Sequence, residues 1–300
     1  MSTDAVDPQR RERVLMRVTD HPTFHRFLQC PTFLSSTHSS LDLLVATRSL
    51  GGQSEIRFVR LGLNNATSTV SVLSLLRPSW ISSGCVGIMP GDVHIDRTGE
   101  ISLFVQAFFR RGDAFTSSIF SAMLQSSSEG LEAISDPQPV LGGEDVDRFF
   151  GVPRILPGSD KDSLVVASPG PGILASAGFP HSYGLFSAPV SSNTVCEEAL
   201  ELLYWPRPRN NWAVAGLATD PSDSGLLWAG IRRTGRPSGS YTLKSFRRGS
   251  GYRGRASTEP SSRRGGYPSS CSIHGRPGLL VSLGSFGEGG IGWIPFLDNV

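Results

Sequence analysis

The residues of this 300-residue chain that could contact a ligand gather in five short segments, each leading into an apolar run. The segments read HRFLQCP, IMPGD, FFGVP, NNWAVA and GGYP. They contain one carboxylate, Asp92, which is our candidate catalytic residue because carboxyl groups serve as general acids and bases. The polar and aromatic side chains in or next to these segments are our candidate ligand-binding residues: Gln29, Arg154, Asn211, Trp212 and Tyr267.

A separate basic stretch, residues 232–264, contains nine arginines and Lys244 against one acidic residue, Glu259. Its second half mixes Arg with Gly, Ser and Tyr, which is typical of segments that contact phosphates and stack on bases. We therefore consider an anionic polymer, RNA or an acidic polysaccharide, as a partner. Its contacts would be Arg247, Arg248, Arg253 and Arg255. The alternatives are a solvated mobile loop and a phosphorylation switch at Ser250.

The elements that must position the five segments recur along the chain. Five short apolar runs resemble one another: LLVAT from Leu43, LFVQA from Leu103, LVVAS from Leu164, LLWAG from Leu226 and LLVSL from Leu279. A polar or glycine-containing turn precedes each run, and another strand-like run precedes each turn. The pattern predicts five β-hairpins at spacings of 53 to 62 residues.

A third strand candidate follows each hairpin, and a fourth follows in three of the five units. Units of about 60 residues with four antiparallel strands are typical of propeller blades, which bury both faces against their neighbours. We therefore predict an all-β, single-domain, five-bladed β-propeller with blades at 21–80, 81–147, 148–208, 209–264 and 265–300. A β-sandwich or a pair of stacked β-domains is the alternative.

The last unit offers only three strand candidates, whereas RVLMRV, residues 13–18, precedes the first unit without a partner. We expect this N-terminal strand to complete the last blade, since such pairing removes an open sheet edge. Ligands of propellers usually bind at one mouth of the central channel, so we expect some of the six candidate site residues to line such a mouth.

The predicted propeller, with its Pro31, Asp92 and Pro153 at corresponding positions, resembles the five-bladed glycoside hydrolases of the arabinanase, xylosidase and invertase-like group. The resemblance implies a carboxylate just before Pro31, Asp92 in the second blade and a glutamate near Pro153. Only Asp92 is present, because Cys30 and Val152 stand at the other two positions. Glu144, Asp145 and Asp147 lie nearby and are candidates to replace a missing acid.

The segment GGYPSSCSIHGRPGLLVSL is more weakly similar to the C-terminal motif of sialidases, which have six blades. That resemblance would make Tyr267 a nucleophile. It also implies an arginine shortly before Pro31, yet Arg26 lies five residues before it. A pocket-lining or core role for Tyr267 is the alternative.

Composition and motifs limit the location and the cofactors that we expect. The chain carries a net charge of +2 with 38% hydrophobic residues and no apolar run long enough for a membrane span, and we expect a cytoplasmic protein, with secretion left open. We expect no metal and no cofactor, because the histidines are scattered, the four cysteines form no C-x-x-C pair and no phosphate-binding loop is present.

These observations favour a non-catalytic or degenerate glycosidase-like propeller that binds a glycan, small ligand or protein at its channel mouth. The first alternative is an active glycoside hydrolase that acts on a plant- or microbe-type glycan and uses Asp92. The second is the anionic-polymer binder described above.

Overall fold

The computed structural model describes most of the chain. The described residues are 13–20, 22–24, 28–48, 53–64, 68–96, 98–127, 130–144, 147–158, 161–170, 172–173, 183–190, 195–205, 212–221, 223–233, 241–248, 266–283 and 289–296. They form twenty strands and one short α-helix, α1 (Pro78–Ser82), with three 3-10 turns at Val18–Asp20, Pro22–Phe24 and Glu197–Ala199. The all-β prediction is confirmed. None of the described helices has the length and hydropathy of a membrane span.

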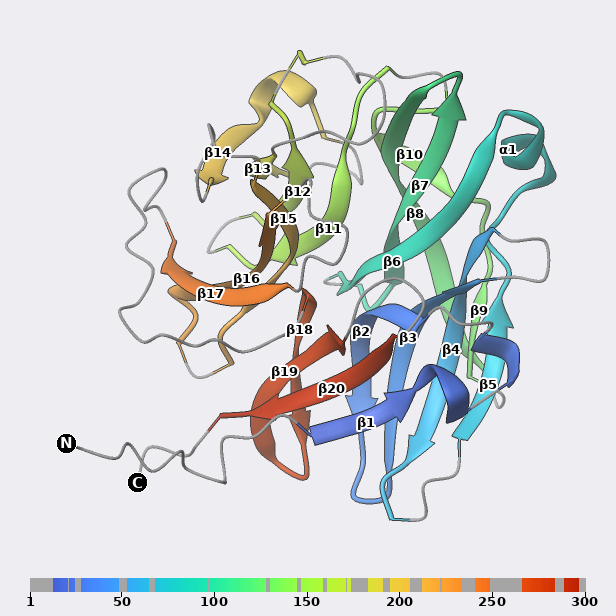
Figure 1. The fold of residues 1–300 in the computed structure, drawn as a ribbon, viewed down its shortest axis with the longest axis vertical. Helices are drawn as coiled ribbons and strands as arrows, with labels where there is room; N and C mark the ends of the chain where they lie inside the picture. Colours follow the sequence, from blue (N-terminus) through green and yellow to red (C-terminus); the bar gives the residue numbers. More distant parts are fainter. Residues whose placement is uncertain are drawn as a thin grey trace.

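The strands fall into five groups of antiparallel neighbours (Figure 1). The first is β2 (Leu28–Ser36), β3 (Ser40–Arg48), β4 (Ser54–Gly62) and β5 (Ser68–Leu73). The second is β6 (Cys85–Ile95), β7 (Ile101–Arg111), β8 (Ala114–Ser127), β9 (Gly130–Ala133) and β10 (Gln138–Leu141). One parallel pair, Ser54 with Gly87, joins these two groups into a nine-stranded sheet.

The third group is β11 (Gly151–Leu156), β12 (Ser163–Ser168), β13 (Gly184–Pro189) and β14 (Glu201–Tyr204), and the fourth is β15 (Trp212–Thr219), β16 (Leu226–Arg233) and β17 (Thr242–Arg247). The fifth contains β18 (Gly266–Ile273), β19 (Arg276–Leu283) and β20 (Gly290–Pro295). The N-terminal strand β1 (Arg13–Arg17) pairs antiparallel with β20, as predicted (Figure 1).

Local sequence explains the hairpins. Each predicted apolar run is the second strand of its group and pairs with the strand before it, so the five predicted hairpins are confirmed. The turn between β18 and β19 has two residues, His274 and Gly275, with φ values of 53° and 73°. Positive φ at both positions is the geometry that joins twisted antiparallel strands through a two-residue loop.

Apolar cores lie between successive groups. One cluster of buried side chains contains residues of each neighbouring pair, including the fifth group with the first. Representative members, in that order, are Trp80, Phe104, Leu217, Trp228 and Trp293. The first strands of the groups also contact one another in a cycle: β2 with β6, β6 with β11, β11 with β15, β15 with β18, and β18 with β2. These inner strands surround the axis that positions the candidate site.

Candidate functional site

Each inner strand carries a β-bulge at a corresponding point. The inner strand holds one extra residue relative to its hairpin partner, so two residues lie inside each bulge. These residues are Cys30-Pro31, Gly91-Asp92, Val152-Pro153, Ala215-Gly216 and Tyr267-Pro268. The sequence placed Pro31, Asp92, Pro153 and Pro268 at corresponding positions, and each is the second residue of its bulge. Bulges re-aim side chains, which makes this level of the axis the place to look for a site.

Three bulges hold a non-glycine residue in the left-handed region. The φ values are 53° at Cys30, 49° at Val152 and 49° at Tyr267, and each of these residues precedes a proline. The conformation is costly for a side chain with a Cβ and most of all for a β-branched one, so Val152 is the strongest outlier. Its N–H donates to Oε1 of Gln106 at 2.9 Å, which holds the bulge in place.

The guanidinium of Arg154 joins four inner strands. Arg154 follows the bulge of β11 and is only 4% exposed. Its Nε donates to the carbonyl of Leu217 at 3.1 Å, Nη2 lies 3.4 Å from the carbonyl of Pro268, and Nη1 lies 3.5 Å from Oγ1 of Thr32. Thr32 in turn donates to the carbonyl of Gly91 at 2.8 Å, which brings in the fifth inner strand. Arg154 therefore occupies the axis.

Asp92 lies beside Arg154 and both of its oxygens are engaged. Oδ1 accepts a hydrogen bond from the N–H of Val93 at 3.0 Å, and Oδ2 accepts one from the N–H of Ile155 at 2.9 Å. Burial raises the pKa of Asp92 above its usual range, while the positive charge of Arg154 and these two N–H donors partly offset the rise. The carboxylate is thus held in place by the backbone rather than presented as a free acid.

Asp92 and Arg154 line a cavity of about 240 Å³, which we call the axial cavity. Its other polar side chains are hydroxyls, and the ring of Phe33 forms part of its wall. The residues that supply side-chain chemistry are Phe33, Asp92, Arg154, Thr219, Ser269 and Ser270. At roughly 30 Å³ of liquid volume per water, the cavity has room for about eight waters or one small ring-shaped ligand.

A second hollow, of about 60 Å³, lies on the other side of the bulges. We call it the tyrosine hollow, because Tyr183 and Tyr267 line it with Arg232. Tyr241 packs edge-on against Tyr267, with ring centroids 5.6 Å apart, and its own ring lies under the guanidinium of Arg232. Burial raises the pKa of all three tyrosines.

Of the six candidate residues, the structure brings Asp92 and Arg154 together and places Tyr267 in a different hollow. Asp92 and Arg154 line the axial cavity, Tyr267 lines the tyrosine hollow, and Gln29 is 1% exposed, with no hydrogen-bond partner for its Oε1 in the described part of the chain. Asn211 lies outside the described residues, and only the backbone of Trp212, the first residue of β15, is described.

Two of the three candidate substitute acids, Glu144 and Asp147, do not line the axial cavity. Oε1 of Glu144 accepts a hydrogen bond of 2.8 Å from the indole of Trp80, which belongs to α1. Asp147 is exposed, and Asp145 lies outside the described residues. Tyr267 gains no support as a nucleophile, because its pKa is raised well above its usual value and the described lining of its hollow holds no carboxylate that could act as its base.

Sequence reasoning missed Thr219, Ser269 and Ser270 in the axial cavity and Tyr183, Tyr241 and Arg232 at the tyrosine hollow. A usable signal existed for Ser269. The residues directly after the five bulges are Thr32, Val93, Arg154, Leu217 and Ser269, so Ser269 corresponds to Arg154. The tyrosines come from different strands, and no spacing along the chain reveals that they meet.

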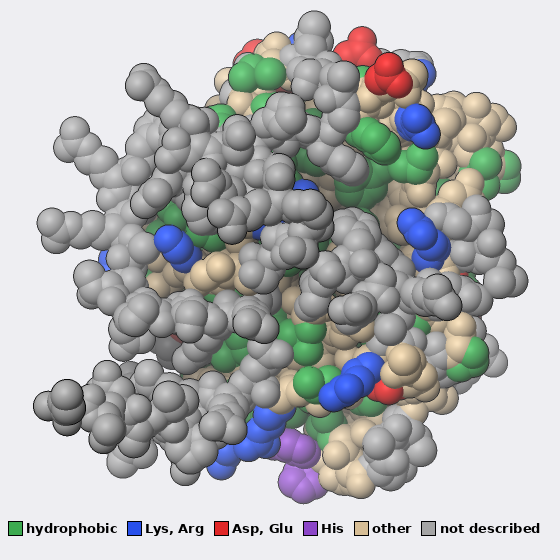
Figure 2. Space-filling model, viewed as in Figure 1, with side chains coloured by type: hydrophobic (Ala, Val, Ile, Leu, Met, Phe, Trp, Pro, Cys, Tyr) green, Lys and Arg blue, Asp and Glu red, His purple; other side chains and the backbone are tan. Residues whose placement is uncertain are grey.

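The basic segment is described only in part. Arg253 and Arg255 lie outside the described residues. Arg247 is 72% exposed and pairs with Asp223 at 3.2 Å, and Arg248 donates to the carbonyl of Pro157 at 3.1 Å, at the edge of the axial cavity. Among the coloured side chains of the face in Figure 2, Lys and Arg are scattered rather than gathered in one patch. Contact with an anionic polymer stays a prediction.

No group of three or more metal-ligating side chains occurs among the residues that the structure describes. The axis itself carries the positive charge of Arg154, which disfavours a cation there. The described cysteines are all free thiols, with Cys30, Cys85 and Cys271 buried and Cys196 exposed.

Comparisons with known proteins give similarity in structure only. No protein-family model matches the chain, and no curated protein matches it. Among solved structures, an α-L-arabinofuranosidase from Lactobacillus brevis matches with a TM-score of 0.61 and 11% identity, over 93% of each chain. The RS223 β-xylosidase matches with a TM-score of 0.59 and 13% identity over 96% of each chain, and the Podospora anserina arabinofuranosidase PaAbf62A with 0.60 and 9% over 95% of each chain. The chain therefore has the fold of the glycoside hydrolase propellers.

Proposed function

We propose that this protein is a five-bladed propeller that binds a sugar in the axial cavity and does not hydrolyse it. The observation that carries the proposal is the position of Asp92 beside the buried guanidinium of Arg154, in a cavity whose other side-chain donors are hydroxyls. The five strand groups and the cycle of inner strands support the blade number.

The arrangement lacks the groups for the usual hydrolysis. Glycoside hydrolases need a carboxylic acid and a second carboxylate, about 5 to 9.5 Å apart, on either side of the scissile bond. Asp92 is the sole carboxylate in the described linings of the axial cavity and the tyrosine hollow. Both of its oxygens already accept backbone hydrogen bonds, which fix the carboxylate in place, and no second carboxylate in these linings could act as its partner in hydrolysis.

The same groups suit the recognition of a sugar. Hydroxyls of a sugar can accept from the guanidinium of Arg154 and donate to the remaining lone pairs of Asp92. The hydroxyls of Thr219 and Ser270 can also accept from the sugar, since their own protons are engaged in the bond between them and in the bond from Ser270 to the carbonyl of Thr219. The ring of Phe33 offers an apolar face to sugar C–H groups. A glycoside hydrolase from Xanthomonas citri with the same fold, 14% identical over 96% of this chain with a TM-score of 0.56, was solved in complex with xylose. Xylose is therefore the first ligand to test.

The test is a calorimetric titration with xylose, arabinose and glucuronate, with Thr219→Val as the site variant. This change removes one hydroxyl from the cavity and keeps the shape of the side chain. Thr69→Val, on the exposed outer strand β5, is the matched control. We expect at least tenfold weaker sugar binding in the first variant and unchanged binding in the second.

Turnover is checked separately with chromogenic glycosides, using Asp92→Ala for comparison. We expect no turnover by the wild-type protein. Turnover that disappears in Asp92→Ala would show that the protein is an active hydrolase and would overturn the proposal, and turnover that persists would show in addition that Asp92 is not its acid.

A further inference from the structure

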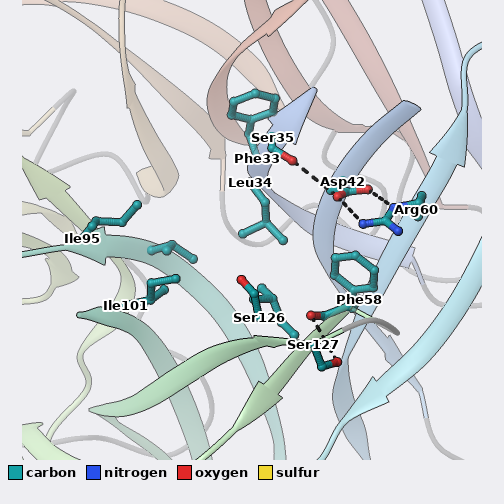
Figure 3. A pocket seen from close by; sticks show the side chains of 13 residues that line it. Phe33, Leu34, Ser35, Asp42, Phe58, Arg60, Ile95, Ile101, Ser126 and Ser127 are labelled. Atoms are coloured by element: carbon teal, nitrogen blue, oxygen red, sulfur yellow. Dashed lines mark hydrogen bonds and ion pairs between the residues drawn. The ribbon is translucent and has the colours of Figure 1, made fainter. Parts of the chain in front are cut away.

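A larger cavity, of about 310 Å³, opens between the first and second strand groups (Figure 3). Its lining comes from the ends of β2, β4, β6 and β8 and from the beginnings of β3, β7 and β9. The axial cavity is likewise lined by residues at and beyond the bulges of the inner strands. Both cavities therefore lie toward the same ends of the inner strands. We call the larger one the inter-group cavity.

Aliphatic side chains form one part of the wall of the inter-group cavity, and serine hydroxyls and an ion pair form another. Leu34, Val93, Ile95, Ile101 and Leu131 contribute aliphatic side chains to it. Ile95 is 63% exposed, the largest exposed fraction among the exposed hydrophobic side chains of the described residues. A cluster of partly exposed aliphatic side chains around a cavity marks a surface that gains free energy when an apolar group covers it.

A fixed ion pair forms the outer edge of this cavity. Nε and Nη2 of Arg60 donate to the two oxygens of Asp42 at 2.8 and 2.9 Å, and the guanidinium lies over the ring of Phe58 at 5.6 Å. Figure 3 shows this pair on one side of the cavity, across from Ile95 and Ile101. Because the two charges neutralise each other, this edge of the inter-group cavity does not require a ligand that carries a charge.

The two cavities are neighbours. Phe33 lines both, and the consecutive residues Asp92 and Val93 line one each. Adjacent residues of a strand point to opposite faces, so β6 presents its carboxylate to the axial cavity and its aliphatic side chain to the inter-group cavity. The carboxylate of Asp92 and the aliphatic wall that includes Val93 thus lie on either side of β6, and Phe33 borders both cavities.

We propose that the ligand is an amphipathic glycoside whose sugar occupies the axial cavity and whose apolar aglycone occupies the inter-group cavity. This inference rests on the proposed sugar binding and specifies the class of ligand. Phe33 contacts both halves, one on each side of its ring. The aliphatic wall, including Ile95, covers the aglycone, and the Asp42 to Arg60 pair limits its length.

The experiment is a titration with xylose and with methyl, butyl, hexyl and octyl xylosides, each kept below its micelle concentration. We expect affinity to rise by about two- to fourfold for each methylene that becomes buried, until the cavity is filled. Ile95→Ser should flatten this rise and leave the affinity for free xylose within twofold of wild type. Ile134→Ser is the matched control, since Ile134 is 55% exposed and lies outside the lining of the cavity.

The outcomes separate this inference from the proposed function. Xylose binding without any dependence on chain length would overturn the inference and leave the proposed function standing. A chain-length dependence that is the same in Ile95→Ser and Ile134→Ser would also overturn it. Binding of octyl xyloside that needs Ile95 but is insensitive to Thr219→Val, with no binding of xylose, would overturn the sugar site and the two-compartment ligand together.

Discussion

The carboxylate of Asp92 accepts a hydrogen bond of 2.9 Å from the backbone N–H of Ile155, a residue of the next inner strand. The bond joins β6 to β11, and a second N–H, from Val93, engages the other oxygen. These two hydrogen bonds give Asp92 a structural role, because they join two inner strands whether or not a proton is transferred. We therefore interpret Asp92 as a residue that fixes the axial cavity and contacts its ligand.

Burial of Asp92 should make stability depend on pH in a defined direction. Folding raises its pKa, so the folded protein holds this proton more tightly than the unfolded chain. Its contribution to stability is therefore present below about pH 4, the unfolded pKa, and is lost as the pH rises toward the folded value. We expect wild type to lose stability relative to Asp92→Asn over this window, as measured by urea unfolding. A difference that is constant with pH, or that changes in the opposite direction, would contradict the raised pKa.

Removal of the guanidinium of Arg154 should destabilise the protein. Arg154→Met leaves Asp92 buried beside no cation and leaves the carbonyl of Leu217 without its donor. Leaving such a buried acceptor without its donor costs about 1 to 3 kcal/mol. The exposed Arg276→Met should change the free energy of unfolding by less than about 0.5 kcal/mol.

A second change tests whether the charges are coupled. The double variant Arg154→Met with Asp92→Asn should recover part of the loss, because the uncompensated charge is gone. Additive effects in this double-mutant cycle would show that the two side chains act independently.

The pairing of β1 with β20 should contribute measurably to stability. Met16 is 2% exposed and packs in the cluster that contains Ile291 and Trp293, whereas Val14 on the same strand is 48% exposed. Met16→Ala should cost about 2 to 5 kcal/mol in urea unfolding, and Val14→Ala should cost less than about 0.5 kcal/mol. Equal effects of the two substitutions would contradict the described packing of the N-terminal strand.

A close approach of backbones beside the site predicts an intolerant glycine. A Cβ at Gly91 would lie 2.3 Å from Cγ of Pro153 and 2.7 Å from the carbonyl oxygen of Phe104. Gly91→Ala should therefore destabilise by about 1 to 3 kcal/mol through overpacking. Gly143→Ala is the control, since a Cβ there meets nothing within 4 Å. A Gly91→Ala variant as stable as its control would show that the two inner strands lie farther apart.

The hairpins could be predicted because their signals are local. Apolar runs such as LVVAS, bounded by turn residues, specify a strand that is buried on both faces, and β12 spans this run. The pairing of β1 with β20 was also predictable, since the last unit offered only three strand candidates and the N-terminal strand candidate belonged to no unit. The helix α1 was missed, because five residues give no helical period and Trp80 alone anchors it in the core.

The site was only partly predictable. Equal distances from the apolar runs placed Asp92 and the three prolines at corresponding positions, and the bulges confirm that correspondence. Sequence could not show that Arg154 would cross the axis. The position of an arginine along the chain does not indicate which other strands its long side chain reaches. The hydrogen bonds of Arg154 reach three other inner strands, and its side chain lines the axial cavity but not the described part of the tyrosine hollow.

The most direct measurement of sugar binding in the axial cavity is an amide NMR titration of the full chain with xylose. We predict shift changes that cluster at Thr219, Ser269 and Ser270, together with Ile155, whose N–H donates to Asp92. The ligand spectrum of xylotriose under the same conditions should stay unchanged, because the sugar is bound and not cleaved. Shift changes confined to Tyr183 and Tyr267, or the appearance of free xylose from xylotriose, would contradict this prediction.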